Sequence, residues 1–366
     1  MLKQLLITAI LVFVLFSASC NKASKSGSSE FTIRTGVNVS HWLSQSDARG
    51  AERLNYITKA DFDTIAAMGF DHVRLPVDEV QLWDSLGQKE KEAWTLLHNA
   101  IKWAFQAKLR VIVDLHIIRS HHFIAASNPL WTDPAEQEKL VGLWRQLSAE
   151  LHQYPNDKLA YEILNEAVAD NPQDWNNLFN KVLADIRLRE PDRIVVLGSN
   201  RWQIPDTFPE LQIPQNDRNI ILSFHFYTPM ALTHHLASWS PVADYAGPVN
   251  YPGWIVDTLN YPGMSPGTVA VMRSYANGYF DHDVLTKAMS PAIKVARENN
   301  LPLYCGEYGV YPTIPEDLRL RWYSDVCSIF NENRIAYSHW CYKGDFPVVD
   351  KQGTRDAKLV AVLTAP

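Results

Sequence analysis

Short apolar runs alternate with amphipathic segments along the chain from about Phe31 onward. Most of these runs are continuous rather than alternating, which is typical of strands buried on both faces of a parallel sheet. Eight such runs occur: Arg34–Val39, His72–Leu75, Arg110–Leu115, Leu159–Leu164, Arg193–Leu197, Asn219–Phe226, Leu303–Gly306 and Ala336–Cys341.

Helical patterns fill the intervals between the runs. One begins with a capping-box-like Thr58-Lys-Ala-Asp61 and meets a stop signal at Gly69. Others are expected near 92–107, 140–151, 174–188, 284–298 and 317–332, where apolar residues recur at helical spacing.

Eight strands that alternate with helices predict an α/β fold, a closed (β/α)8 TIM barrel. The alternative is an open doubly wound sheet, but the first strand is not followed by G-x-G-x-x-G. No linker interrupts residues 31–366, so we expect a single domain.

The connection after the sixth predicted strand is unusually long. It covers about 228–283 and is rich in Pro, Gly, Tyr and Trp. Loops of this length in compact domains are usually functional or disordered, and the aromatic content favours an ordered excursion over the barrel mouth.

The N-terminus has the pattern of a processing segment. Lys3 precedes an apolar stretch, Leu5 to Phe16, that is too short for a transmembrane helix. Residues 1–20 are therefore predicted to be a signal peptide. Small residues before Cys20 resemble a bacterial lipoprotein cleavage box with Cys20 lipidated, although Ser17 departs from it; an ordinary signal peptide is the alternative. Residues 21–30 are predicted to be a flexible tether.

The composition excludes some classes of function. A net charge of -6 and the lack of a basic stripe argue against nucleic-acid binding. The 12 Trp and 15 Tyr residues suit both core packing and stacking on sugar rings.

No Cys/His spacing matches a metal site, so no metal or other cofactor is expected. Cys305, Cys327 and Cys341 are expected to be buried thiols, with Cys305 sharing the inward direction of Glu307.

Polar and aromatic residues gather where the predicted strands end. In a barrel of this kind the carboxyl ends of the strands carry the chemistry. Glu166 and Glu307 each close an apolar run, and two carboxylates facing one cleft are the minimum for glycoside hydrolysis. The other strand ends supply Arg74, Asp114, His116, Asn165, His225, Tyr227, His339 and Trp340.

Taken together and in order, these motifs resemble glycoside hydrolase family 5, the cellulase family of clan A. The resemblance runs from about residue 33 to 345, with about one motif for each expected strand. It is carried by Gly36-Val-Asn38, Val73-Arg-Leu-Pro76, Asp114-Leu-His116, Leu164-Asn-Glu166, His225-Phe-Tyr227, Gly306-Glu-Tyr-Gly309 and Trp340.

The resemblance implies a division of labour. Glu166 would be the general acid/base and Glu307 the nucleophile of a retaining enzyme. Arg74 and Tyr227 would hold Glu307, and Asn165 would bind the sugar 2-hydroxyl.

His116 and His225 would line the site, and Trp340 would stack against the reacting sugar. Further candidates for sugar contact are Asn38, His41, Trp42, Trp131, Asn200 and Trp202.

The predicted activity is hydrolysis of β-glycosidic bonds in a polysaccharide or oligosaccharide, with endo-β-1,4-glucanase as the best single choice. The family also implies alternatives: exo action, or specificity for β-mannan, xyloglucan, β-1,3-glucan or small glycosides. Transglycosylation and a non-catalytic carbohydrate-binding protein are the remaining hypotheses. The only membrane association expected is through a lipid on Cys20, in the periplasm or at the cell surface; without that lipid, the exported protein is expected to be secreted.

Overall fold

A computed structural model of the chain describes residues 30–256 and 262–365. The chain divides into residues 1–30 and 31–366, and the second unit holds the fold. The predicted signal peptide, Cys20 and the tether up to residue 29 lie outside the described residues. Among the residues that are described, no helix has the length and apolar character needed to cross a membrane.

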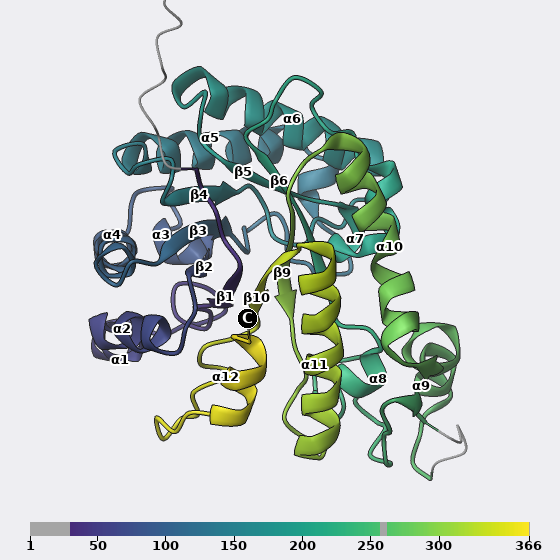
Figure 1. Cartoon of the computed structure of the whole chain (residues 1–366). Helices are drawn as coiled ribbons and strands as arrows, with labels where there is room; N and C mark the ends of the chain where they lie inside the picture. Colours follow the sequence, from purple (N-terminus) through teal and green to yellow (C-terminus); the bar gives the residue numbers. More distant parts are fainter. Residues whose placement is uncertain (1–29, 257–261, 366) are drawn as a thin grey trace, which may run out of the picture. The chain divides into compact units, whose positions relative to one another are not determined.

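Eight parallel strands close into a barrel, which confirms the predicted fold (Figure 1). Each strand lies within or close to one of the eight apolar runs. Their order around the barrel is β1-β10-β9-β6-β5-β4-β3-β2. The strands are β1 (Thr35–Asn38), β2 (His72–Val77), β3 (Arg110–Leu115), β4 (Leu159–Glu162), β5 (Val195–Gly198), β6 (Ile220–Phe226), β9 (Leu303–Tyr308) and β10 (Ala336–His339).

Helices surround the strands, as Figure 1 shows for α4, α5, α6, α10 and α11. Each buries its apolar face against the sheet. The predicted capping motif forms, since the Thr58 N–H donates to Asp61 (2.7 Å) at the start of α2. The helices of the barrel are α1 (Ala51–Tyr56), α2 (Lys59–Ala67), α3 (Glu79–Leu82), α4 (Lys91–Gln106), η1 (Pro129–Trp131), α5 (Pro134–Leu151), α6 (Pro172–Arg189), α7 (Asn200–Gln203), η2 (Pro205–Glu210), α10 (His282–Asn299), α11 (Glu316–Asn333) and α12 (Ala357–Leu363).

The barrel interior changes from apolar to charged along the strands. Ile112, Ala160, Val196 and Ile221 form one buried layer with Phe31 packed against it. Because side chains alternate in direction along a strand, the next inward positions toward the carboxyl ends are two residues further on. On β3 and β4 these are Asp114 and Glu162, and both are buried, which places charge directly beneath the barrel mouth.

The connection between β6 and α10 is an ordered excursion in its described parts, residues 228–256 and 262–281. It is not a bare loop, because it carries several short elements of its own. They are α8 (Met230–Thr233), β7 (Gly253–Trp254), α9 (Pro266–Val271), the π-helical turn η3 (Met272–Ala276) and β8 (Tyr279–Phe280). The strands β7 and β8 pair in an antiparallel ladder.

The expected direction of Cys305 is wrong. Cys305 packs in the main core cluster with Tyr308, between the strands and the helices. The ladder between β6 and β9 shifts register, since Phe224 pairs with Cys305 and His225 with Glu307. An irregularity of this kind breaks the strict alternation on which the expectation depended. The three cysteines of the described chain are buried free thiols, as expected.

Candidate active site

The two glutamates singled out by the sequence lie close together at the carboxyl ends of the strands. Glu307 lies on β9, and Glu166 follows β4 by four residues. The structure brings three atoms within 4.8 Å of one another: a carboxylate oxygen of Glu166, a carboxylate oxygen of Glu307 and a ring nitrogen of His225. Retaining glycosidases hold their carboxyl groups about 5–5.5 Å apart, whereas inverting enzymes need about 6.5–9.5 Å. The separation is therefore that of a retaining pair.

Arg74, which is fully buried on β2, is the centre of the charged cluster. Its guanidinium contacts Glu307 (2.7 Å), Glu162 (2.7 Å) and Asp114 (3.0 Å). A buried cation is costly unless its charge is neutralised and its N–H groups are bonded. Two amide oxygens complete its hydrogen bonds, those of Asn38 (3.0 Å) and Asn165 (2.8 Å).

Glu307 is held from both sides. Its Oε1 accepts from Arg74, and its Oε2 accepts from the Tyr227 hydroxyl (3.1 Å). Burial raises the pKa of Glu307, while the Arg74 guanidinium opposes that rise. Burial and the neighbouring Glu307 carboxylate keep the pKa of Tyr227 well above its usual range, so its hydroxyl remains a donor.

Glu166 has a different surrounding. Its Oε1 lies 2.7 Å from Nδ1 of His225. Burial, and then the charge of Glu307, raise the pKa of Glu166 well above its usual range. Burial and Arg74 hold the pKa of His225 well below its usual range, so the imidazole is neutral. Glu307 therefore loses its proton first, and Glu166 retains one.

Among the described residues, four buried polar atoms of the cluster have no hydrogen-bond partner: Oδ1 of Asp114, Nδ2 of Asn165, Nε2 of His116 and Nε2 of His225. Such atoms cost about 1–3 kcal/mol each when they stay unpaired. Nδ1 of His116 bonds to Asp114 (2.7 Å), and burial lowers the pKa of His116 to about 3. Its Nε2 is therefore a neutral acceptor. Donors and acceptors left free in this way suit the hydroxyl groups of a sugar.

Trp340 lies at the end of β10, against the same cluster. Its ring stacks on His116, with centroids 5.5 Å apart and planes 9° apart. His41 approaches from another side, 6.0 Å away between centroids, and its Nε2 bonds to Asp345 (3.1 Å). A sugar held by the unpartnered polar atoms of the cluster would therefore meet the flat apolar surface of the Trp340 ring.

A profile of the family described as cellulase (glycosyl hydrolase family 5) matches residues 32–345. That range contains every residue of the cluster. The chain belongs to glycosyl hydrolase family 5. It is therefore a glycoside hydrolase, with the retaining mechanism that characterises the family.

Curated relatives agree with this assignment. Endoglucanase C of Acetivibrio thermocellus is 30% identical over 328 residues, which cover 87% of this chain and 94% of the relative. Cellodextrinase A of Ruminococcus flavefaciens is 27% identical over 308 residues, 83% and 84% of the two chains. A crystal structure of a hyperthermophilic endo-β-1,4-glucanase with substrate is 25% identical, with a TM-score of 0.73 over 91% of this chain and 97% of that one.

Two of the family 5 site candidates at the first strand are not placed for sugar contact. Trp42 is 1% exposed, and its indole N–H donates to the Arg53 carbonyl (2.8 Å), so neither face is free. Asn38 is fully buried and bridges Arg74 to the Gly306 carbonyl (2.9 Å). Both expectations of direct binding are wrong: Trp42 packs in the core, and Asn38 supports Arg74.

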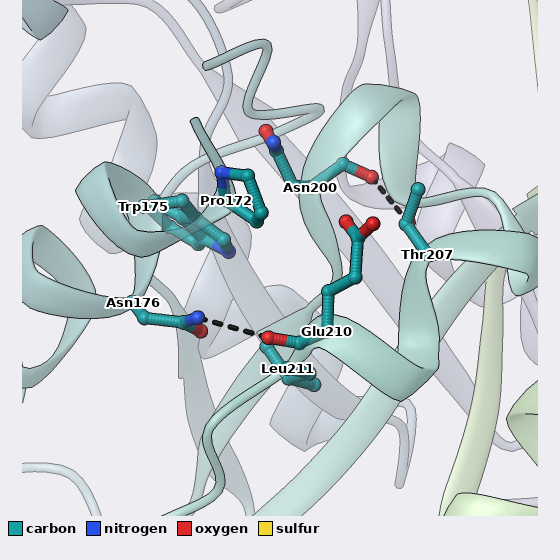
Figure 2. A pocket seen from close by; sticks show the side chains of 7 residues that line it. All are labelled: Pro172, Trp175, Asn176, Asn200, Thr207, Glu210 and Leu211. Carbon is teal, nitrogen blue, oxygen red and sulfur yellow. Dashed lines mark hydrogen bonds between the residues drawn. The ribbon is translucent and has the colours of Figure 1, made fainter. Parts of the chain in front are cut away.

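Asn200 is likewise a structural residue. Its amide group pairs with both backbone groups of Ala169 (2.9 Å each). Figure 2 shows it beside a small recess, where the Thr207 hydroxyl donates to the backbone carbonyl of Asn200 (2.7 Å). The other residues that line this recess are Pro172, Trp175, Asn176, Glu210 and Leu211.

The two remaining tryptophans differ from each other. Trp131, in η1, packs edge-on against His121 and Trp175, neither of which belongs to the catalytic cluster. Trp202 is 42% exposed, and its indole donates to the Phe123 carbonyl (2.7 Å). Because Phe123 packs against His116, Trp202 lies at the rim of the site and keeps an open face.

Sequence reasoning missed several residues of the site. Glu162 is a buried carboxylate within the apolar run that Glu166 closes, so the cost of burying a charge could have revealed it. His234 packs edge-on against Tyr227 with centroids 5.0 Å apart. Gln203 contacts the backbone of Glu166, and no signal in the sequence marks it.

Proposed function

We propose that the protein hydrolyses β-1,4-glucan by double displacement, with Glu307 as the nucleophile and Glu166 as the acid/base. The observation that carries these roles is the close approach of two carboxylates in unequal surroundings. One is paired with a guanidinium, and the other lies against a neutral imidazole. Two titrating groups whose environments separate their pKa values are suited to opposite roles at one pH.

In the first step, Glu307 attacks the anomeric carbon while Glu166 gives its proton to the departing glycosidic oxygen. A covalent glycosyl ester forms on Glu307, and the aglycone leaves. In the second step, Glu166 takes a proton from water, which attacks the same carbon and releases Glu307. Arg74 and Tyr227 favour the charged form of Glu307 when it departs.

The free polar atoms support a matching role in substrate binding. Nδ2 of Asn165 is a free donor that would bond the sugar 2-hydroxyl, a contact that strengthens toward the oxocarbenium-like transition state. Nε2 of His116 would accept from a neighbouring hydroxyl. Trp340 would stack against the apolar face of the reacting sugar.

β-1,4-Glucan is the proposed substrate because curated relatives that match most of the chain are named endoglucanases. A panel of carboxymethylcellulose, β-mannan, xyloglucan and β-1,3-glucan, with sizing of the products, tests this choice. Fastest cleavage of the cellulose derivative into a range of oligosaccharides supports endo-β-1,4-glucanase action. Fastest cleavage of any other polymer contradicts the substrate.

A second candidate is action on short cello-oligosaccharides from one end. It is favoured by an aromatic series that runs from the site to the excursion. Tyr227 contacts Phe346, Phe346 contacts Tyr311, and Tyr311 contacts Trp239, at 5.2–6.0 Å between centroids. One relative is also named a cellodextrinase. A single small product released from cellohexaose, with little loss of polymer viscosity, would favour this candidate.

For the N-terminus we propose export, with Cys20 lipidated as the first mature residue and residues 21–30 as a tether. The support is the apolar stretch and the small residues before Cys20. Mass spectrometry of the mature N-terminus tests it: a diacylglyceryl-modified Cys20 is expected. A mature chain that begins at another residue without lipid would contradict it.

A further inference from the structure

The turn α7, Asn200–Gln203, has an unusual backbone. Arg201, Trp202 and Gln203 have φ values of 53°, 61° and 54°, so three consecutive non-glycine residues are left-handed. Glu166 is also left-handed, with φ of 45°. Residues with side chains avoid this region because the Cβ atom comes too close to the backbone there. Surrounding contacts must hold both segments in place.

The side chain of Gln203 joins the two strained segments. It is 1% exposed, and its Oε1 accepts from the backbone N–H of Glu166 (2.8 Å). Its Nε2 lies 3.4 Å from Glu162 and 3.3 Å from the Ser223 hydroxyl. A Cβ on Gly198 would lie 2.4 Å from the Gln203 side chain, so the glycine makes room for it.

Other contacts between the two segments reach residues that follow Glu166 in the chain. The backbone N–H of Trp202 donates to the Ala167 carbonyl (3.3 Å), and the Asn200 side chain bonds to the backbone of Ala169. Gln203 instead bonds to Glu166 itself. His225 contacts the carboxyl end of Glu166, so the two contacts hold both ends of this residue.

We propose that Gln203 is a positioning residue that aims the Glu166 carboxyl at the glycosidic oxygen. The inference rests on the proposed role of Glu166 as acid/base. When the bond to the Glu166 N–H is lost, the left-handed backbone of Glu166 relaxes and its carboxyl moves away from the glycosidic oxygen. Proton donation then suffers, whereas attack by Glu307 does not.

The leaving group separates these two effects. Cellotetraose needs protonation of its departing oxygen, but 2,4-dinitrophenyl β-cellobioside does not. Gln203→Met keeps the length of the side chain and removes the acceptor. We expect it to lower kcat/KM about 100-fold for cellotetraose and less than about fivefold for the aryl cellobioside. An equal loss on both substrates, or no loss on either, overturns the inference.

Two further variants make the result unambiguous. Asn200→Ala loosens the same turn without touching Glu166, so it should lower both rates by a similar factor. Glu166→Ala should show the selective loss in full, with azide restoring turnover of the aryl cellobioside. If Glu166→Ala is not selective, the proposed function fails; if only Gln203→Met is not selective, this inference fails alone.

Gln203→Asn, which is too short to reach the Glu166 N–H, replaces Gln203→Met if that variant does not fold.

Discussion

The catalytic cluster and the excursion after β6 are built in opposite ways. In the cluster, Glu307 is 5% exposed and Arg74 is fully buried, and each bonds to partners on other strands. In the excursion, Trp239 is 45% and Trp254 58% exposed; Trp239 lies outside the helices and strands, and Trp254 lies on the two-residue strand β7. Positions fixed by strand register suit chemistry that needs accurate geometry. Exposed aromatic residues in loops and on short elements are suited to selecting which substrate binds.

The largest expected effect is at Glu307. Glu307→Gln keeps the shape of the side chain and removes the nucleophile, so kcat/KM should fall by about 10⁴-fold or more with folding intact. Steady-state kinetics on an aryl β-cellobioside measures it.

Glu162→Gln is the matched control, because Glu162 is a buried carboxylate bonded to the same Arg74. It does not reach the substrate in our account, so a much smaller loss of about 10–100-fold is expected. Equal losses in Glu307→Gln and Glu162→Gln would mean that Glu307 contributes only to the charge balance of the cluster, which contradicts its role as nucleophile.

Tyr227→Phe should have a smaller effect, visible mainly as a function of pH. Activity requires ionised Glu307, and the Tyr227 hydroxyl stabilises that carboxylate. Removing a hydrogen bond to a charged group, worth about 1.5–3 kcal/mol, should raise the pKa of Glu307 further, by about one to two units. The acid limb of kcat/KM therefore moves to higher pH. The basic limb, which reports Glu166, should stay in place; an unmoved acid limb contradicts the assignment.

The smallest effect is expected in the excursion. Trp239→Ala should raise KM for cellohexaose about three- to tenfold and leave kcat unchanged, since an exposed stacking surface is worth about 1 kcal/mol. Trp254→Ala is the control, because its ring pairs with Tyr279 and, within the described part of the chain, with no ring of the series that leads to Tyr227. If the two variants behave alike, the aromatic series does not bind substrate and the contrast between the two regions weakens.

The sequence predicts the barrel and the catalytic pair well, because one simple rule governs both. Continuous apolar runs mark strands of a parallel sheet, and the polar residues that close them must meet at one end of the barrel. Glu166, Glu307, His225 and Tyr227 follow from this rule, and the structure brings them together.

The failures have equally specific causes. Trp42 and Asn200 lie at strand ends like true site residues, but packing decides which way such side chains point. Cys305 was misplaced by the register shift beside Glu307, which no propensity marks. Gln203 depends on a left-handed turn without glycine, a conformation that local sequence argues against.

Trapping the covalent intermediate tests the central claim most directly. With 2,4-dinitrophenyl 2-deoxy-2-fluoro-β-cellobioside, the fluorine slows both steps and the good leaving group lets the first one proceed. Digestion and mass spectrometry then locate the sugar. Our account predicts one fluorocellobiosyl group per chain, on Glu307. A label on Glu166, or no covalent species together with inverted products from an unmodified substrate, would contradict it.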